Sequence, residues 1–248
     1  MVGNLVLLRH GQSQWNLENR FTGWWDVDLS EQGEKEARAA GVCLSKAGVS
    51  VDRAYTSVLT RAVKTLYLAL EEMGRSWVPV TGHWRLNERH YGALTGLDKA
   101  ATKQRYGEQQ FMLWRRSFST PPPPMPAGHE FDVRGDDRYR ELAPDVVPDT
   151  ECLSDVVVRM LPYWYDAIAP DVIAGRTVLV VAHGNSLRAL IKHLDGISDS
   201  DIAEMEIPTG VPIVYQLDST LAVTSKGALG DPDAIAAAAE SVRRQGDR

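Results

Sequence analysis

The sequence predicts an α/β fold, a three-layer sandwich in which helices flank a mainly parallel central sheet. Continuous apolar runs at residues 5–8 and 177–182 are typical of strands that are buried on both faces. Longer stretches of helical pattern separate such runs, and this alternation favours a parallel sheet. The composition, with 44% hydrophobic and 24% charged residues, is ordinary for a globular protein with a large core.

Strands and helices alternate through the first third of the chain. Ser30 suits the N-cap of a long helix, and Gly48 stands where a left-handed residue would end that helix. Pro79 lacks a backbone N–H, so a strand that contains it belongs at the edge of the sheet. The expected strands are residues 5–8, 54–57 and 78–80, and the expected helices are residues 30–47 and 58–73.

The last hundred residues repeat this alternation. Thr150 is the expected cap of a helix over residues 151–169, which Pro162 should kink or interrupt. A further short helix is expected to open at Ser198, with Asp201 completing a capping box. The other expected elements are the strands at residues 177–182, 212–217 and 221–224 and a helix at residues 186–194.

Two segments depart from this pattern. Residues 119–150, here called the insertion, hold seven of the thirteen prolines and should be irregular or polyproline-like. Neither flank reads as an independent domain, so we expect a single domain over residues 1–248 with an ordered insertion. The C-terminal tail, residues 226–248, contains a short predicted helix with Asp231 as N-cap and Pro232 at its first position.

Composition and charge argue against several classes of protein. No stretch approaches the roughly 20 apolar residues of a membrane span, and the start of the sequence does not read as a signal peptide. A net charge of −6 does not suit a protein that binds nucleic acid through phosphate contacts. The two cysteines, Cys43 and Cys152, cannot form a cysteine-only zinc site or a disulfide framework, so we expect a cytoplasmic protein.

Two histidine–glycine turns follow the two strongest predicted strands. Arg9, His10 and Gly11 come after the first, and His183 and Gly184 come after the later one. Ligands of open α/β sheets bind beyond the carboxyl ends of the strands. A single histidine after a strand is more often structural, but two such turns should point both imidazoles into one crevice if the strands are central and parallel.

Several basic residues extend this candidate site. Arg61 is expected near the start of a helix on the ligand side, and a loop around Glu88 combines a carboxylate with potential cations. Lys99 and the pair Arg115–Arg116 follow. Any one of these cations taken alone is more often simply solvated. Arginine suits phosphate and carboxylate oxygens, so the set as a whole suggests phosphoryl chemistry on a small anion.

Competing motifs are weak. Ser186 lies in a segment that begins like a nucleophile elbow, but Arg188 stands where that motif needs glycine. His129–Glu130 lacks the second histidine of a zincin, and the six histidines show no close ligand spacing, so we expect no metal.

Two N-terminal segments resemble the signature of the cofactor-dependent phosphoglycerate mutases: Arg9–Asn16 and Phe21–Trp24. These mutases belong to the histidine phosphatase superfamily. The resemblance covers nearly the whole chain. It continues through Tyr55–Ser57 with Arg61, Leu86–Leu94, Lys99, Arg115–Arg116, the proline run, Ala182–Leu190 and Ile207–Pro212. Cys152 departs from the serine that is common in the family, and the approach to the tail lacks the usual aromatic residues.

The resemblance implies a phosphoglycerate mutase-like fold and the interconversion of 2-phosphoglycerate and 3-phosphoglycerate in glycolysis and gluconeogenesis. His10 would be the nucleophile, primed by 2,3-bisphosphoglycerate, and Glu88 the general acid and base. Arg9, Arg61 and His183 would surround the transferring phosphoryl group. The expected substrate-binding residues are Arg9, His10, Gly11, Gln12, Ser13, Gln14, Trp15, Asn16, Thr22, Gly23, Arg61, Glu88, Arg89, His90, Tyr91, Lys99, Arg115, Arg116, Gly184 and Asn185.

Family members fold the tail over the pocket, and this implies a lid here. The resemblance also implies a homo-oligomer, a dimer or a tetramer, that uses small phosphoglycerates and needs no metal. Three alternatives remain open: a bisphosphoglycerate mutase or phosphatase of the same superfamily, a binding protein on an enzyme scaffold, and a serine hydrolase acting through Ser186. An intact set of candidate catalytic residues argues against the binding protein.

Overall fold

The computed structural model describes residues 3–245. Its centre is a six-stranded sheet with the strand order β3-β2-β4-β1-β5-β6. Strands β3, β2, β4 and β1 are parallel, and β5 and β6 are added antiparallel at one edge. The strands are β1 (Asn4–Arg9), β2 (Arg53–Thr56), β3 (Val80–Gly82), β4 (Thr177–Ala182), β5 (Pro212–Leu217) and β6 (Val223–Ala228). The mainly parallel sheet that the sequence predicts is therefore confirmed.

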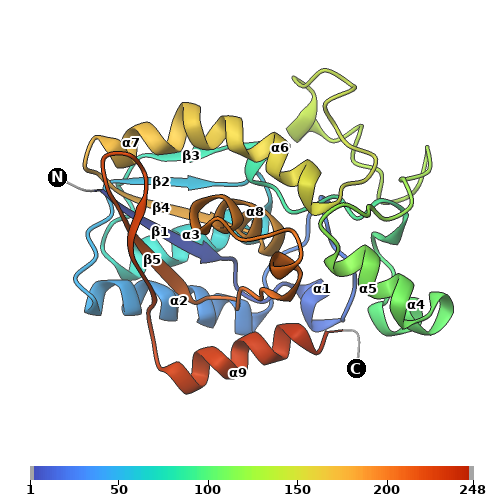
Figure 1. Cartoon of the computed structure of the whole chain (residues 1–248), viewed down its shortest axis with the longest axis horizontal. Coiled ribbons are helices and arrows are strands. Elements are labelled where there is room, and N and C mark those ends of the chain that lie inside the picture. Colours follow the sequence, from blue (N-terminus) through green and yellow to red (C-terminus); the bar gives the residue numbers. More distant parts are fainter. Residues whose placement is uncertain (1–2, 246–248) are drawn as a thin grey trace.

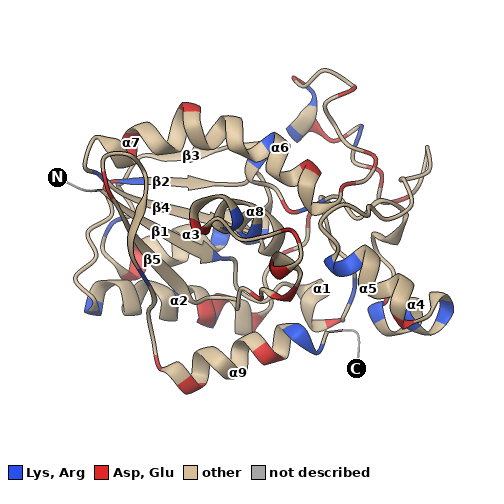
Figure 2. Cartoon of the chain, in the orientation of Figure 1, with Lys and Arg blue, Asp and Glu red and all other residues tan. Residues whose placement is uncertain are grey.

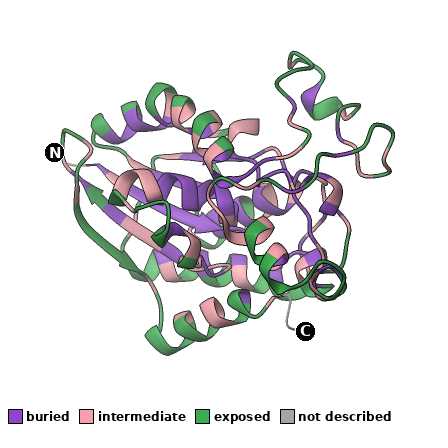
Figure 3. Ribbon diagram, turned by 45° about the vertical axis from the view of Figure 1, so that its right-hand side comes forward, coloured by how far each residue is buried: buried purple, intermediate pink, exposed green. Residues whose placement is uncertain are grey.

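Helices cover both faces of this sheet and make the other two layers (Figure 1). Alternate residues of β1 point to opposite faces, so Leu5 and Leu7 pack with one group of helices and Val6 and Leu8 with the other. The first group is α6 (Leu153–Tyr163), α7 (Ala169–Ile173) and α8 (Gly184–Asp195). The second group is α2 (Glu31–Lys46) and α3 (Thr60–Glu72). Figure 3 shows the buried residues concentrated in the sheet and in the helix faces against it.

Two helix ends follow the predicted cap chemistry. The side chain of Ser30 accepts a hydrogen bond from the backbone N–H of Gly33, and Gly48 has a φ of 70° just after α2. In the tail, Asp231 accepts from the N–H of Ala234 at the start of α9 (Pro232–Arg243).

Several predicted boundaries differ from the structure: β3 is Val80–Gly82 instead of residues 78–80, and β6 is Val223–Ala228 instead of residues 221–224. Cys152, and not Thr150, caps α6, because Thr150 donates to the carbonyl of Pro122 in the insertion. The interruption expected at Pro162 is confirmed, because α6 ends at Tyr163 and a π-helix at Trp164–Ile168 connects it to α7. The Ser198 hydroxyl accepts from the backbone N–H of Asp201 at 3.1 Å, as expected, but the helix there is only a short 3₁₀ turn at Asp201–Glu204 with Ser200 as N-cap.

Short elements and loops gather beyond the arrowheads of β1 and β2 (Figure 1). They comprise α1 (Gln14–Leu17), α4 (Lys99–Tyr106), α5 (Glu108–Arg116) and 3₁₀ turns at Trp84–Leu86, Gly92–Leu94 and Asp137–Tyr139. The last of these turns is the only helical element that the described structure places in the insertion. Within the described range, no helix is long and apolar enough to cross a membrane.

Candidate active site

The two histidine–glycine turns meet at the carboxyl ends of the neighbouring strands β1 and β4. Arg9 pairs with Ala182 across the two strands, and the N–H of His10 donates to the carbonyl of Ala182 at 3.0 Å. The next residues are therefore neighbours, and the imidazole rings of His10 and His183 lie with their centroids 4.9 Å apart. Both rings are buried. The two imidazoles therefore lie together at the strand ends, as expected, but only His10 lines the cavity.

The environment of His10 prepares one ring nitrogen to act as a nucleophile. Nδ1 lies 2.7 Å from the carbonyl oxygen of Gly11, which can only accept, so Nδ1 carries the proton. Nε2 is then left with its lone pair. Burial, and then the charges of Arg61 and Arg9, hold the pKa of His10 well below its usual value. The imidazole is therefore neutral at pH 7.

His183 is fully buried beside His10 and does not form part of the cavity wall. Its Nε2 is 2.7 Å from the hydroxyl of Ser57, which also accepts from the N–H of Leu59. Burial, and then the charge of Arg61, holds the pKa of His183 well below its usual value. Nδ1 is buried without a hydrogen-bond partner among the described residues.

Two guanidinium groups flank the histidines and bond only to carbonyls. Arg61 donates to the carbonyls of Gly23 at 2.7 Å and Trp25 at 3.1 Å, while Arg9 donates to the carbonyl of Ile207 at 2.7 Å. Burial lowers the pKa of Arg61 to about 10, so this side chain stays charged at pH 7. Buried cations held by neutral groups leave a positive field in the cavity that an anion would complement.

Glu88 is the carboxylate nearest to this group. Its Oε1 accepts from the backbone N–H groups of Arg89 and Asn185, at 2.7 and 3.1 Å. Its Oε2 makes no hydrogen bond or ion pair within residues 3–245 and lies 3.6 Å from the position that a Cβ on Gly184 would occupy. Arg159 donates to the carbonyls of Asn87 and Glu88, which fixes the backbone of the loop.

A second group of cations lies farther out in the same cavity. Burial, and then the charge of Arg115, lowers the pKa of Lys99 to about 7. Arg116 forms an ion pair with Glu206, and Arg188 donates to Asn185 and to the carbonyl of Ile202. Basic residues are seen at α5, at α8 and at the C-terminal end of α9 (Figure 2).

The end of the tail contacts this second group. Arg115 donates to the carbonyls of Val242 and Arg243, at 2.7 and 3.2 Å. Lys99 donates to the side-chain oxygen of Gln245 at 3.0 Å. Val242 and Gln245 therefore form part of the cavity wall, and residues 246–248 lie outside the described part of the chain.

The cavity has a volume of about 660 Å³ including its open mouth. Thirteen of the predicted site residues line it: Arg9, His10, Asn16, Thr22, Gly23, Arg61, Glu88, Tyr91, Lys99, Arg115, Arg116, Gly184 and Asn185. Eight others lie outside the wall: Gly11, Gln12, Ser13, Gln14, Trp15, Arg89, His90 and His183.

The sequence reasoning missed seven lining residues: Arg20, Phe21, Arg188, Glu206, Ile207, Val242 and Gln245. Helical periodicity could have found Arg188, because it lies one turn after Gly184 and Asn185. No local signal marks Glu206, since only the ion pair with Arg116 brings it to the cavity.

Among the described residues, no group of three or more histidine, cysteine, aspartate or glutamate side chains is arranged to hold a metal ion. From the described part of the chain, the cavity wall receives seven cationic side chains: Arg9, Arg20, Arg61, Lys99, Arg115, Arg116 and Arg188. It contains two carboxylates, Glu88 and Glu206. The arrangement can thus hold a highly charged anion with one phosphorus atom against His10.

Comparisons with known proteins agree with this geometry. A family model described as the histidine phosphatase superfamily (branch 1) matches residues 5–146 and 134–220. The chain is 59% identical, over 98% of its length and 97% of the relative, to a 2,3-bisphosphoglycerate-dependent phosphoglycerate mutase of Streptomyces avermitilis. It is 57% identical to one of Thermobifida fusca, over 99% of this chain and 100% of that protein.

Among solved structures, a mycobacterial glucosyl-3-phosphoglycerate phosphatase has a TM-score of 0.67 with 26% identity, over 86% of this chain and 92% of that one. The family model and the relatives together span almost all of the sequence. The chain therefore belongs to the histidine phosphatase superfamily and, within it, to the 2,3-bisphosphoglycerate-dependent phosphoglycerate mutases.

Proposed function

We propose that the protein interconverts 2-phosphoglycerate and 3-phosphoglycerate, with the phosphoryl group carried in turn by His10. The observation that carries this proposal is the division of the cavity cations into two groups. Arg9 and Arg61 lie close to His10, where their charges lower its pKa, whereas Lys99 and Arg115 bond to the end of the tail and Arg116 pairs with Glu206. A mutase must hold two anionic ends of one molecule at once, and two separate cationic groups suit that task.

The residues present fit 2,3-bisphosphoglycerate, which supplies the phosphoryl group that primes His10. Two phosphates and a carboxylate carry roughly four to five negative charges at pH 7. The cavity wall has seven cations and two carboxylates, a difference of five. The Nε of Arg9 is a buried donor without a partner among the described residues, so a bound anion would complete its hydrogen bonding.

In the proposed reaction the lone pair on Nε2 of His10 attacks phosphorus, and the bond from phosphorus to the donor oxygen breaks. The hydrogen bond from Nδ1 to Gly11 keeps the ring in the required tautomer and stabilises the positive charge that develops on it. The return step reverses this: a substrate hydroxyl attacks phosphorus and the bond to Nε2 breaks.

Glu88 handles the proton in both directions. As an acid it protonates the oxygen that leaves, and as a base it takes the proton of the hydroxyl that attacks. Because Oε1 is held by two backbone N–H groups, Oε2 is the oxygen that is left to exchange the proton. Arg9 and Arg61 stabilise the charge on the equatorial oxygens of the phosphoryl group, and His183, whose ring centroid lies 4.9 Å from that of His10, supports this part of the site.

The remaining parts of the proposal follow from this activity. The reaction is a step of glycolysis and gluconeogenesis, so the protein is expected in the cytoplasm. Its partners are small phosphoglycerates, with no nucleic acid and no membrane. We further propose a homo-oligomer, a dimer or a tetramer, as family resemblance implies, and a reaction that needs no metal.

A coupled assay from 3-phosphoglycerate, with and without added 2,3-bisphosphoglycerate, tests the activity. We expect turnover that depends on the bisphosphate and that EDTA leaves unchanged. Predominant hydrolysis, or predominant formation of the bisphosphate, would instead identify a phosphatase or a bisphosphoglycerate mutase.

Labelling tests the role of His10. Incubation with 2,3-bisphosphoglycerate should add one phosphoryl mass that is stable in alkali and lost in acid, as phosphohistidine is. The adduct should be absent from His10→Ala. A label that persists in this variant, or that maps to Ser13 in the wild type, would disprove the assignment.

A further inference from the structure

The insertion carries two arginine–aspartate pairs of the same local design. In each pair the backbone N–H and the guanidinium of the arginine donate to the aspartate two residues earlier: Arg134 to Asp132, and Arg138 to Asp136. The two arginine side chains have similar exposed fractions, 37% and 32%. Each arginine also forms an ion pair with a second aspartate, and the location of this second aspartate differs between the two pairs.

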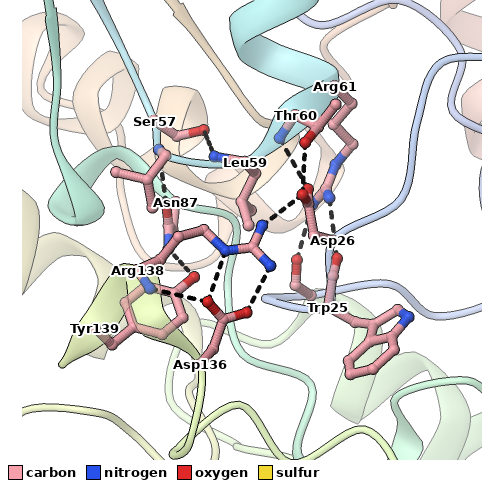
Figure 4. Close-up of polar contacts among 12 residues, drawn as sticks. Trp25, Asp26, Ser57, Leu59, Thr60, Arg61, Asn87, Asp136, Arg138 and Tyr139 are labelled. Carbon is pink, nitrogen blue, oxygen red and sulfur yellow. Dashed lines mark hydrogen bonds and ion pairs between the residues drawn. The ribbon is translucent and has the colours of Figure 1, made fainter.

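Arg134 pairs with Asp149, which also belongs to the insertion. Arg138 instead pairs with Asp26, which lies outside the insertion in the loop that leads to Trp25 and Gly23 (Figure 4). The Asp26 side chain is only 18% exposed. Arg138 is thus a connection between the insertion and the loops of the active site.

Asp26 holds the first turn of α3. Its carboxylate accepts from the backbone N–H of Thr60 at 2.8 Å and from the Thr60 hydroxyl at 2.5 Å. The N-cap residue of α3 is Leu59, whose side chain cannot accept a hydrogen bond. Asp26 therefore supplies from a distant loop the acceptor that the local sequence lacks.

These contacts surround Arg61 on both sides. Arg61 directly follows Thr60 on α3, and it donates to the carbonyl of Trp25, which directly precedes Asp26. One carboxylate thus fixes the start of the helix that carries Arg61 and the loop whose carbonyl accepts from it. A shift of Asp26 would move both anchors of this guanidinium.

Tyr139, the residue after Arg138, also connects the insertion to a loop of the active site. The hydroxyl of Tyr139 accepts from the side-chain amide of Asn87 at 2.9 Å, and Asn87 directly precedes Glu88. Asn87 also accepts from the N–H of Val58 at 3.3 Å, next to Ser57. Consecutive residues of the insertion therefore contact both loops that carry candidate catalytic groups.

We propose that Arg138 is a positioning residue of the active site: acting through Asp26, it holds the guanidinium of Arg61 where the phosphoryl group is transferred. Arg138 itself does not line the cavity. The inference rests on the proposed function. Its physical basis is that a donor stabilises a transition state only when it is held in place beforehand, so a small displacement lowers turnover more than binding.

The matched pair Arg138→Gln and Arg134→Gln tests the proposal. Both changes remove a guanidinium that bonds to the aspartate two residues earlier, and the two arginine side chains are about equally exposed. We expect Arg138→Gln to lower kcat by about tenfold. We expect it to change KM for 3-phosphoglycerate by less than about twofold. Arg134→Gln should match the wild type in both constants, with the fold of both variants checked by circular dichroism.

Orthovanadate, which imitates the five-coordinate phosphoryl group, gives a second readout. Its affinity, measured by calorimetric titration, should fall in Arg138→Gln by about the same factor as kcat. Arg138→Lys should recover part of the loss, because lysine can still pair with Asp26. Asp26→Asn should reproduce the loss, and the double variant should be no worse than Asp26→Asn alone, since both changes break one chain of contacts.

Equal behaviour of Arg138→Gln and Arg134→Gln, or a rise in KM with kcat unchanged, would overturn the proposal. The titration also separates this outcome from failure of the proposed function. If the wild type shows no mutase activity, the proposed function fails, and the difference in orthovanadate affinity between the two variants still decides the role of Arg138.

Discussion

Lys99 and Arg61 are both buried, and within residues 3–245 they donate hydrogen bonds to neutral oxygens, those of Gln245, Gly23 and Trp25. Burial lowers the pKa of each, to about 7 for Lys99 and about 10 for Arg61. Arginine therefore remains charged throughout the physiological range, whereas the charge of Lys99 is sensitive to pH near neutrality. This difference in pH sensitivity matters because Arg61 belongs to the cations around His10, whereas Lys99 belongs to the cations that contact the tail.

The pH dependence of substrate capture should report this difference. Lys99 is protonated below its pKa of about 7 and loses its charge as the pH rises through that value. We expect kcat/KM for 3-phosphoglycerate to fall above this pH by up to about tenfold per unit, because kcat/KM reports groups of the free enzyme. Rates between about pH 6.5 and pH 9 would measure the fall, in a range where the substrate phosphate stays dianionic.

Lys99→Arg is the control, since a guanidinium keeps its charge over the whole range. Its profile should be flat where that of the wild type falls. If both proteins lose activity in parallel above neutrality, a group other than Lys99 sets the profile.

At the scale of single elements, α9 connects the tail to the cavity. Its N-terminal half is exposed, but Val242 near its end is buried, and two of its last carbonyls bond to Arg115. A cation at the C-terminal end of a helix also suits the helix dipole. The tail is thus held mainly by its end, at the residues proposed to bind substrate.

Deletion of residues 230–248 should lower mutase turnover by more than about tenfold, because a lid keeps the intermediate bound and keeps water from phosphohistidine. Hydrolysis of 2,3-bisphosphoglycerate should fall much less, and circular dichroism should show an intact fold. Val242→Asp should reproduce the effect, while Ala237→Asp, at an exposed position of the same helix, should not. Equal loss of both activities would mean that the tail is no such lid.

The elements also show what local sequence can and cannot predict. The caps at Ser30 and Asp231 were predicted because their partners lie three residues away. The cap of α6 was misplaced because Thr150 is bonded to Pro122, a contact that depends on how the insertion returns. The edge strand β3 begins at Val80, one residue after Pro79, whose carbonyl still accepts from Ala54.

In the candidate site, too, some residues could be predicted from local sequence and others could not. His10 and His183 could be placed together because both follow strands, and parallel strands end at one edge of the sheet. The roles assigned to them, and to Glu88, came from family resemblance and remain predictions. Glu206 and Val242 reach the cavity through contacts across the fold, which no spacing in the sequence records.

At the scale of the whole molecule, the insertion shares a small core with an N-terminal segment. Val133, Tyr139 and Val147 of the insertion pack with Trp24. This packing supports the prediction of one domain. It also shows why the insertion can be ordered despite its prolines: it buries apolar side chains against the same loop that carries Asp26.

Charge is distributed unevenly over the molecule. The chain has a net charge of −6, yet the cavity wall has seven cations and two carboxylates. A phosphoglycerate approaching from a distance meets repulsion from the whole and attraction from the cavity. Because field lines concentrate in a cleft with low-dielectric walls, the local attraction should dominate capture.

The dependence of kcat/KM on salt concentration should show whether the field of the cavity or that of the whole molecule controls substrate capture. The screening length falls from about 30 Å at 0.01 M salt to about 8 Å at 0.15 M. If the cavity attracts the substrate, kcat/KM for 3-phosphoglycerate should fall several-fold, by roughly three- to tenfold, over this range. Stopped assays in potassium glutamate and in sodium chloride would separate screening from competition by chloride. A rise in kcat/KM with salt would show that repulsion by the whole molecule controls the encounter.

Two variants that each remove one positive charge make this test specific to the cavity. Arg20→Gln removes a charge from the cavity wall, and Lys46→Gln removes one from an exposed position at the end of α2. Both shift the net charge equally, so a whole-molecule field predicts the same salt dependence for both. A cavity field predicts a shallower dependence for Arg20→Gln alone, since fewer charges then attract the substrate at close range.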